Sequence, residues 1–247
     1  MARARLLVVQ HQASCPPGLL ADAAEEHGVE LAVVAVDRGD RVPRRLDGAT
    51  GLVVLGGAMG VADMADHPHL ETTMELIRDA AAEEAPTLGI CLGGQLAAHA
   101  LGGRAYEAAE GLEYGWIELA LTPAGRTDAV LGVLGQRARV FSAHNDVFDP
   151  PPGATLLARG ADRPNQAFRL GSVVGVQFHP EVDAGMLARW HAHARKPPPR
   201  SEREIVEGAL RHAAAARRVL DAFCEVVARG PGLTRATRHR RSRPRSA

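Results

Sequence analysis

A cysteine flanked by glycines at the end of a short apolar run constrains this chain more than any other feature. Residues 86–95 read Pro-Thr-Leu-Gly-Ile-Cys-Leu-Gly-Gly-Gln, with Cys91 at the centre of a Gly-x-Cys-x-Gly spacing. Small residues two positions before and after a nucleophile let a strand and a helix approach closely while the central residue takes a strained conformation. The helix formers at 95–101 end at Gly102, so we expect Cys91 at a helix N-terminus, which favours the thiolate.

The alternative for Cys91 is a small buried core residue, as most lone cysteines are. The flanking glycines favour the nucleophile. Together with Cys15 and Cys224 it makes an odd number of cysteines without paired spacing, which argues against a disulfide scaffold and fits a reducing compartment. Since no apolar run approaches the roughly 18 residues of a membrane span, and no signal-peptide core is found, we predict a cytoplasmic protein without membrane association.

Short apolar runs alternate with helix-length amphipathic segments over the first hundred residues. The predicted strands are 6–9, 31–36, 51–55 and 87–90, and the predicted helices between them include 18–27 and 70–85. This order predicts right-handed crossovers and a mostly parallel sheet with helices on both faces. Beyond residue 103 shorter strands separated by turns predict an antiparallel extension. The predicted fold is therefore α/β, a flavodoxin-like three-layer α/β/α sandwich.

The chain divides into three predicted parts. Residues 1–196 are predicted to form the main domain, 197–229 a helical extension packed on it, and 230–247 a disordered basic tail. The tail holds six arginines and no acid, although the whole chain balances 29 basic against 29 acidic residues. Arginines can neutralise phosphates, but no aromatic residue interleaves them, so we expect a solvated terminus and no nucleic-acid partner.

A thiolate nucleophile needs a base that takes and returns protons, and histidine is the usual partner. His179 is the strongest of the eleven histidines because it ends the predicted strand 172–178 and precedes Glu181 by two positions. Side chains two apart point to the same side of an extended backbone, so the carboxylate can orient the imidazole. The alternative is a histidine that ends a strand beside a solvated acid.

Acyl transfer also needs N–H donors where the oxyanion develops, and losing one such donor typically costs about 2.7 to 4 kcal/mol. The backbone N–H of Leu92 is one candidate. The second would come from the loop 56–58, Gly-Gly-Ala, where glycine lets the peptide turn its N–H toward the thiol.

Two histidine pairs could suggest a metal, namely His67 with His69 and His191 with His193. No cysteine or acid with zinc-ligand spacing accompanies either pair. We therefore predict solvated histidines and no metal.

Three segments together resemble the signatures of the class I glutamine amidotransferases, the family with a Cys-His-Glu triad. They are residues 88–95, the Leu-Gly-Gly of 55–57, and Gly-Val-Gln-Phe-His-Pro-Glu at 175–181. Their order and spacing match from about residue 6 to residue 185. Within the family the chain is most similar to stand-alone proteins that resemble the amidotransferase domain of GMP synthase, a subgroup that also contains plant γ-glutamyl peptidases.

The resemblance implies that Cys91 attacks the side-chain amide of glutamine, forms a γ-glutamyl thioester and releases ammonia. His179 would act as general base and acid, Glu181 would orient it, and the N–H groups of Gly57 and Leu92 would form the oxyanion hole. Water would then hydrolyse the thioester. No cofactor is implied.

The resemblance also implies a set of substrate-binding residues, with Asp146 holding the ammonium group. The set is Gly56, Ala58, Gln95, His144 and Asp146. Ala58 stands where relatives generally have proline, which predicts a less rigid oxyanion loop, and Asn145 replaces a common glycine.

Beyond residue 185 we find no phosphate loop and no second catalytic unit. Ammonia would therefore pass to a separate synthetase subunit, or the protein would hydrolyse γ-glutamyl peptides or related small molecules. A non-enzymatic alternative is a catalytically idle regulatory or binding subunit.

Overall fold

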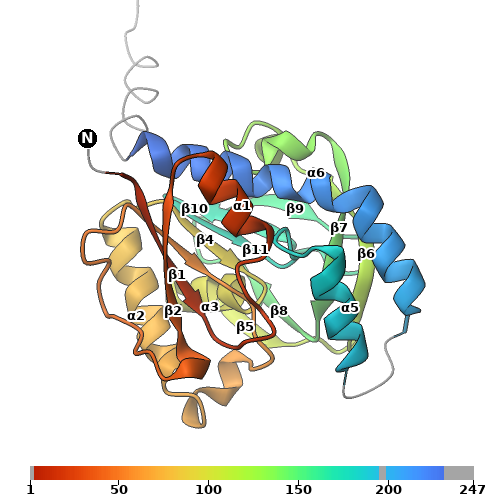
Figure 1. Ribbon diagram of the computed structural model, residues 1–247, viewed down its shortest axis with the longest axis horizontal. Helices are drawn as coiled ribbons and strands as arrows, with labels where there is room; N and C mark the ends of the chain where they lie inside the picture. The colour runs from red at the N-terminus through yellow and green to blue at the C-terminus, as the bar shows by residue number, and fades with distance from the viewer. Residues whose placement is uncertain (1–2, 195–198, 231–247) are drawn as a thin grey trace, which may run out of the picture.

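The computed structural model describes residues 3–194 and 199–230 and contains a nine-stranded central sheet (Figure 1). Five neighbouring strands are parallel: β2 (Glu30–Ala35), β1 (Arg5–Gln10), β3 (Gly51–Val54), β4 (Thr87–Ile90) and β11 (Val173–Val176). The sheet continues with antiparallel β10 (Ala167–Leu170), β9 (Thr155–Arg159), β6 (Glu113–Leu121) and β7 (Arg137–His144). This confirms the predicted parallel sheet with an antiparallel extension.

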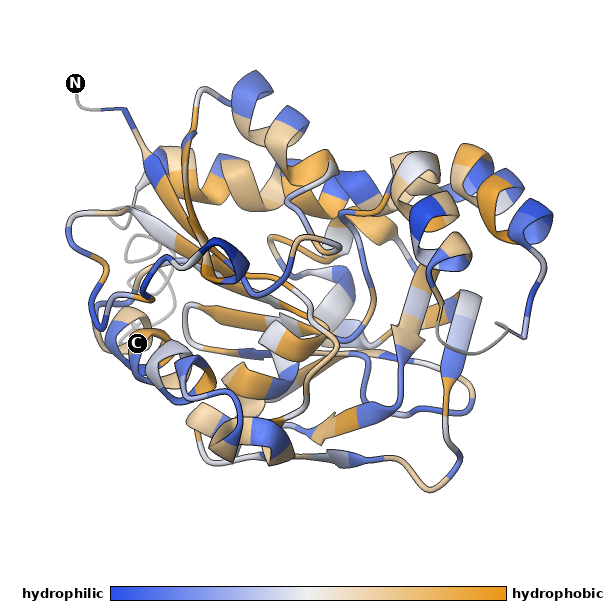
Figure 2. Cartoon of the chain, turned by 60° about the horizontal axis from the view of Figure 1, so that its bottom comes forward, coloured by the Kyte–Doolittle hydropathy of each residue, from blue (hydrophilic) through white to orange (hydrophobic). Residues whose placement is uncertain are grey.

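Helices cover both faces of the sheet, which makes three layers (Figure 1). They are α1 (Leu19–Glu26) and α6 (Glu202–Arg229) on one face, and α2 (His69–Ala82) and α3 (Leu92–Ala100) on the other. Side chains alternate along β1, so Leu6 and Val8 enter the core under α1 and α6, while Leu7 and Val9 enter the core under α2 and α3. Figure 2 shows apolar residues throughout the central strands, as expected for a sheet buried on both faces.

The long helix α6 is part of the main core. It begins at Ser201, whose hydroxyl accepts a hydrogen bond from the N–H of Glu204 at 3.3 Å. Val219, Leu220 and Phe223 are buried in the same cluster as the strands. Within the predicted extension 197–229, α6 therefore packs together with α1 on one face of the sheet of the 1–196 unit. The predicted tail from residue 231 onward lies outside the described residues.

Several elements were not predicted. They are the two-stranded sheet of β5 (Arg104–Glu107) and β8 (Asp146–Asp149), the short α4 (Pro123–Arg126), α5 (Ala184–Ala192), and the 3₁₀ turns η1 (Val36–Arg38), η2 (Val61–Ala65) and η3 (Gly132–Leu134). β5 is mostly exposed and polar, so it lacks the alternation that reveals a half-buried strand. None of the described helices has the length and apolar character needed to cross a bilayer.

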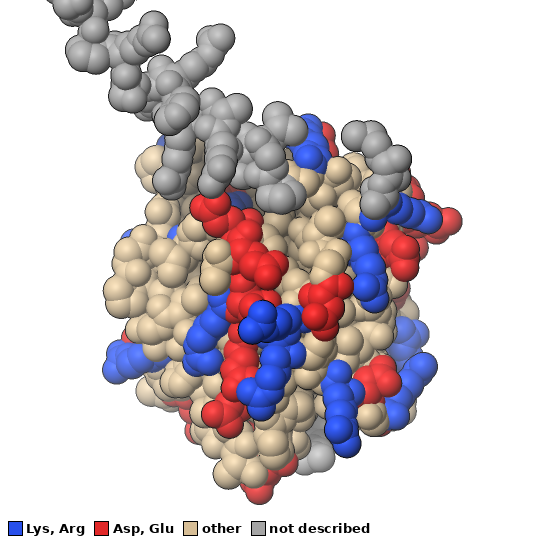
Figure 3. Space-filling view, turned by 90° about the vertical axis from the view of Figure 1, so that its left-hand side faces the viewer, with Lys and Arg blue, Asp and Glu red and all other residues tan. Residues whose placement is uncertain are grey.

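Charges of both signs occupy the face on the side of α2. On α2, Glu71, Glu75 and Asp79 follow one another at intervals of four residues, and Arg44 pairs with Glu75 at 2.5 Å. Figure 3 shows acidic side chains gathered in a stripe among arginines on the left-hand side of Figure 1. This face is therefore mixed in charge, which suits a solvated surface.

Candidate active site

Cys91 lies at the turn between β4 and α3, as predicted. Its backbone has φ 52° and ψ −109°, a conformation that non-glycine residues rarely adopt. A Cβ on Gly89 would overlap the carbonyl oxygen of Gly93, and a Cβ on Gly93 would overlap that of Val54. Only glycines at both positions let β3, β4 and the start of α3 approach this closely, so the predicted strand–turn–helix geometry around Cys91 is present.

His179 and Glu181 form a buried pair just beyond the end of β11. The Nδ1 of His179 lies 2.7 Å from Oε1 of Glu181, and the two residues are 2% and 1% exposed. The backbone N–H of His179 donates to the carbonyl of Phe141 on β7 at 2.8 Å, which anchors the turn. With Nδ1 facing the carboxylate, Nε2 is the nitrogen left to exchange a proton.

The charges around His179 favour its protonated form. Burial lowers the pKa of the ring, but the Glu181 carboxylate and the Cys91 sulfur outweigh burial and hold that pKa well above 6.5. Trp190 on α5 packs edge-on against the imidazole, with ring centroids 5.0 Å apart. The imidazole is thus held by the Glu181 carboxylate and by a T-shaped contact with the indole of Trp190.

The loop after β3 is pressed against these groups. A Cβ on Gly56 would lie 3.1 Å from Cε1 of His179 and 3.6 Å from Cβ of Cys91. Among the described residues, the backbone N–H groups of Gly57 and Leu92 have no hydrogen-bond acceptor. Leu92 is the first residue of α3, where an N–H has no partner within the helix. Both candidate oxyanion donors are therefore free to bind a ligand.

Gln177 connects Cys91 to Gln95. Its Nε2 donates to Sγ of Cys91 at 3.8 Å, while its Oε1 accepts from Nε2 of Gln95 at 3.5 Å. Both glutamines are buried. Sequence reasoning gives Gln177 no role although it lies two residues before His179, because nothing in the sequence indicates that its side chain faces the sulfur.

The side chains of Gln95 and His144, which were predicted to bind substrate, form hydrogen bonds with other protein groups and do not line the cavity. Gln95 Nε2 and His144 Nδ1 both lie within hydrogen-bond distance of the backbone carbonyl of Asp146, at 2.9 and 2.8 Å. The other ring nitrogen of His144 lies 2.9 Å from Oε2 of Glu113. These two residues therefore shape the segment that carries Asp146.

Glu113 is the centre of this network. Its Oε2 accepts hydrogen bonds from Ser142 at 2.9 Å and Gln166 at 3.0 Å, besides its contact with His144. Burial raises the pKa of Glu113, but these hydrogen bonds outweigh burial and hold the pKa below its ordinary value. Glu113 is thus a carboxylate that fixes the strand end 142–144.

The carboxylate of Asp146 lies against the oxyanion loop. A Cβ on Gly60 would lie 2.5 Å from its Oδ2. Burial and the neighbouring acids Glu107 and Asp63 raise the pKa of the Asp146 carboxyl. The described residues give this side chain no hydrogen-bond donor, so it retains capacity for a cation.

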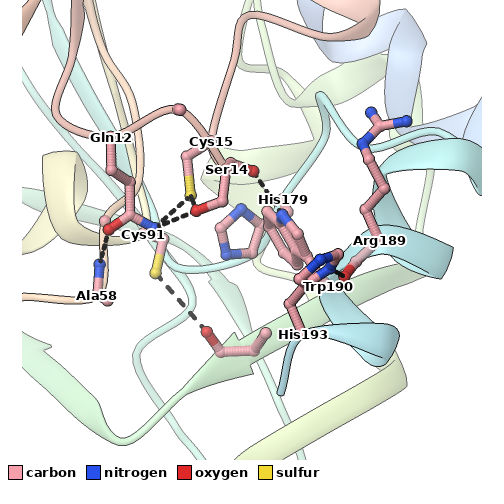
Figure 4. Close-up of a pocket in the computed structure, with 12 residues that line it drawn as sticks. Gln12, Ser14, Cys15, Ala58, Cys91, His179, Arg189, Trp190 and His193 are labelled. Atoms are coloured by element: carbon pink, nitrogen blue, oxygen red, sulfur yellow. Dashed lines mark hydrogen bonds between the residues drawn. The ribbon is translucent and has the colours of Figure 1, made fainter. Parts of the chain in front are cut away.

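A cavity of about 510 Å³ opens above Cys91 (Figure 4). It is lined by Gln12, Ala13, Ser14, Cys15, Gly57, Ala58, Cys91, Ala143, His179, Arg189, Trp190 and His193. The triad candidates Cys91 and His179 thus share one cavity with Gly57 and Ala58, whereas Gln95, His144 and Asp146 do not line it. Sequence reasoning missed the loop 12–15. It follows β1, and the rule that ligands bind at the carboxyl ends of parallel strands could have found it.

Cys15 is a second buried cysteine in the same cavity. Burial raises the pKa of its thiol to about 11, so it stays protonated near neutral pH. It has neither the strained turn of Cys91 nor a position at a helix N-terminus. Of the two sulfurs, Cys91 is the one placed as a nucleophile.

A buried histidine lies beneath the oxyanion loop. His11 is 3% exposed, and a Cβ on Gly57 would lie 3.5 Å from the Cβ of His11. Burial and the nearby His69 lower the pKa of His11 to about 3, and the two rings lie 5.3 Å apart. The prediction that His69 is solvated is wrong in part, because its Nε2 is buried. Among the described residues no three potential metal ligands cluster.

Comparison with known proteins identifies the family. A sequence model described as glutamine amidotransferase class-I matches residues 18–189, which include Cys91, His179 and Glu181. The chain belongs to the class I glutamine amidotransferases. The predicted resemblance is therefore confirmed. The loop 12–15 lies before the matched segment.

Two relatives of this amidotransferase span most of its length. A glutamine amidotransferase-like protein of Salmonella typhimurium is 30% identical over 181 residues, which cover 72% of this chain and 75% of that protein. The crystal structure of a glutamine amidotransferase from Thermotoga maritima superposes with a TM-score of 0.84 at 29% identity, covering 92% of this chain and 99% of that chain.

GMP synthases match over a shorter segment. One subunit of the glutamine-hydrolysing GMP synthase of Saccharolobus solfataricus is 42% identical over 100 residues, which are 39% of this chain and 51% of that subunit. The GMP synthase of Thermomicrobium roseum is 42% identical over 98 residues, only 18% of its length. The match thus spans about half or less of these two relatives.

Proposed function

We propose that this protein hydrolyses the γ-amide of glutamine through a thioester on Cys91 and releases ammonia. The observation that carries the proposal is the buried His179–Glu181 pair, 2.7 Å apart, whose imidazole shares one cavity with Cys91. A cysteine nucleophile, a histidine base and an orienting carboxylate are the groups that acyl transfer requires.

The reaction proceeds in two halves. His179 takes the thiol proton, and Sγ of Cys91 attacks the amide carbon to form a tetrahedral oxyanion. The N–H groups of Gly57 and Leu92 stabilise that charge. The C–N bond then breaks as His179 gives its proton to the leaving nitrogen, which departs as ammonia. Water, deprotonated by His179, attacks the thioester and releases glutamate and the thiol.

Asp146 is proposed to bind the α-ammonium group of the substrate, supported by its carboxylate without a described donor. Gln95 and His144 would act through the carbonyl of Asp146, which both of them contact. Gly56 and Ala58 would form the wall of the site, and Ala58 lines the cavity.

The test is ammonia release from glutamine by the purified chain, with Cys91→Ala as the control. Activity that survives this substitution would contradict the proposal. If glutamine released ammonia, the acceptor would be a separate synthetase subunit, an idea supported by the match to one subunit of a GMP synthase.

The second candidate is a γ-glutamyl peptide hydrolase. It is supported by the cavity, since about 510 Å³ lies within the roughly 300–1,000 Å³ range of pockets that hold drug-sized ligands, a size that includes a dipeptide. Cleavage of a γ-glutamyl dipeptide with no ammonia from glutamine would favour it. An idle regulatory subunit would show neither activity, and its Cys91 would not react with a glutamine-like chloroketone.

A further inference from the structure

The side chain of Gln12 connects two loops at the mouth of the cavity. Its Oε1 accepts a hydrogen bond from the backbone N–H of Ala58 at 3.0 Å. Its Nε2 donates to Oγ of Ser14 at 2.6 Å and to Sγ of Cys15 at 3.3 Å (Figure 4). Because Nε2 faces two acceptors, the amide orientation that points Oε1 at Ala58 is the one that satisfies both ends.

The loop that donates this hydrogen bond has few other restraints. Ala58 is exposed and lies among the glycines of residues 56–60, outside any helix or strand. Among the described residues, Gln12 is the acceptor for the Ala58 N–H. Glycine peptides lose much conformational freedom when they are ordered, so a single anchor here matters.

The anchored peptide adjoins the candidate oxyanion donor. The peptide between Gly57 and Ala58 is held by Gln12, and the preceding peptide carries the N–H of Gly57. Without the anchor, rotation at Gly57 would let that N–H leave the orientation it needs when the oxyanion forms.

The anchor is itself fixed from the other side. The backbone carbonyl of Ser14 accepts a hydrogen bond from Nε1 of Trp190 at 2.5 Å, and Trp190 packs on His179. A continuous set of contacts therefore runs from the triad histidine through Trp190, Ser14 and Gln12 to Ala58.

We propose that Gln12 is a positioning residue that holds the oxyanion loop through the N–H of Ala58. The proposal rests on the proposed function for its effect on turnover. It also bears on the expected loss of rigidity at position 58, because alanine, unlike proline, supplies an N–H that Gln12 binds.

The first test is Gln12→Met, which keeps the length of the side chain and removes both hydrogen-bonding ends. We expect kcat for the γ-glutamyl amide to fall roughly 3- to 10-fold, the effect of one hydrogen bond, with KM changed less than about 2-fold. Alkylation of Cys91 by iodoacetamide forms no oxyanion, so its rate should not change. An unchanged kcat, or an equal loss in alkylation, would overturn the proposal.

Ala58→Pro provides the matched background because proline has no N–H for Gln12 to bind. In this background Gln12→Met should lower kcat by less than about 2-fold. If Gln12→Met lowered kcat in the Ala58→Pro background as much as in the unaltered protein, Gln12 would act through a contact other than the Ala58 N–H.

Hydrogen exchange tests the anchor independently of catalysis. The Ala58 amide of the full chain should exchange at least about 10-fold faster in Gln12→Met than in the unaltered protein, since Ala58 is otherwise exposed. An unchanged exchange rate of the Ala58 amide would overturn the proposal that Gln12 holds the loop. If exchange accelerates but the unaltered protein cleaves no γ-glutamyl amide, the anchor stands and the proposed function fails.

Discussion

The two walls of the cavity are built differently. The inner wall carries Cys91 and His179, and Glu181 pairs with His179; all three are at most 5% exposed and follow strands at the centre of the sheet. The outer wall consists of the loops around Gln12 and Ala58 and of helix α5, joined by single hydrogen bonds. The proposed reacting groups thus take their geometry from the core, whereas their surroundings depend on contacts that one substitution can remove. We therefore expect large effects from the inner wall and small ones from the outer wall.

The largest effect is expected for Cys91→Ala. Removing the nucleophile should lower ammonia release to background, at least about a 10⁴-fold loss, while the fold persists. The measurement is steady-state ammonia release together with the thermal midpoint.

Cys224→Ala is the matched control. Cys224 lies on the buried face of α6, and burial raises the pKa of its thiol to about 12. Its loss should lower the thermal midpoint but leave turnover per folded molecule unchanged. A comparable loss of turnover in both variants would remove the distinction between the two cysteines.

The next effect is expected for Glu181→Gln. The amide can still accept from Nδ1 of His179, but one of the two groups that raise the pKa of His179 is gone, so burial lowers that pKa relative to the unaltered protein. We expect kcat to fall roughly 10²- to 10³-fold. The basic limb of the kcat/KM profile, which reports loss of the histidine proton, should move to lower pH. A basic limb that stays in place would contradict the role given to Glu181.

The inner wall could be predicted from the sequence because its signals are local. Gly89 and Gly93 lie two residues from Cys91, and Glu181 lies two residues from His179. Short-range rules for turns and extended backbone apply directly at such distances.

The outer wall could not be predicted in this way. Gln12 and Ala58 are 46 residues apart, and Trp190 and Ser14 are 176 residues apart. Such pairs are set by how helices and loops pack, which leaves no periodic signal. The contacts of Gln95 and His144 with the carbonyl of Asp146 could not be predicted for the same reason, since they depend on tertiary packing.

The third prediction concerns His11 beneath the outer wall. An unfolded histidine titrates near pH 6.5, whereas His11 in the folded protein has a pKa of about 3, so the unfolded state binds more protons between these values. Stability from the neutral ring is present above pH 6.5 and is lost as pH falls toward 3. We expect His11→Leu to reduce the loss of unfolding free energy between pH 7 and pH 5 by about 2 kcal/mol.

Urea denaturation at both pH values measures this difference. The substitution also changes the unfolding free energy by an amount that does not depend on pH. This amount cancels when the difference between pH 7 and pH 5 is compared in the two proteins. If the unfolding free energy depended on pH equally in the two proteins, the folded state would protonate His11 as readily as the unfolded state does.

The smallest effect is expected for Trp190→Phe. Trp190 contacts both walls, and this substitution removes its contact with one of them while keeping its contact with the other. Phenylalanine keeps a ring against His179 but loses the Nε1 hydrogen bond to Ser14. We expect kcat to fall about 2- to 3-fold, because the outer loop loosens while the triad stays in place. Trp190→Ala removes both contacts and should cost clearly more, since the face of the imidazole then opens to water. Equal losses in the two variants would mean that the ring contact contributes nothing, and the distinction between the walls would not hold at this residue.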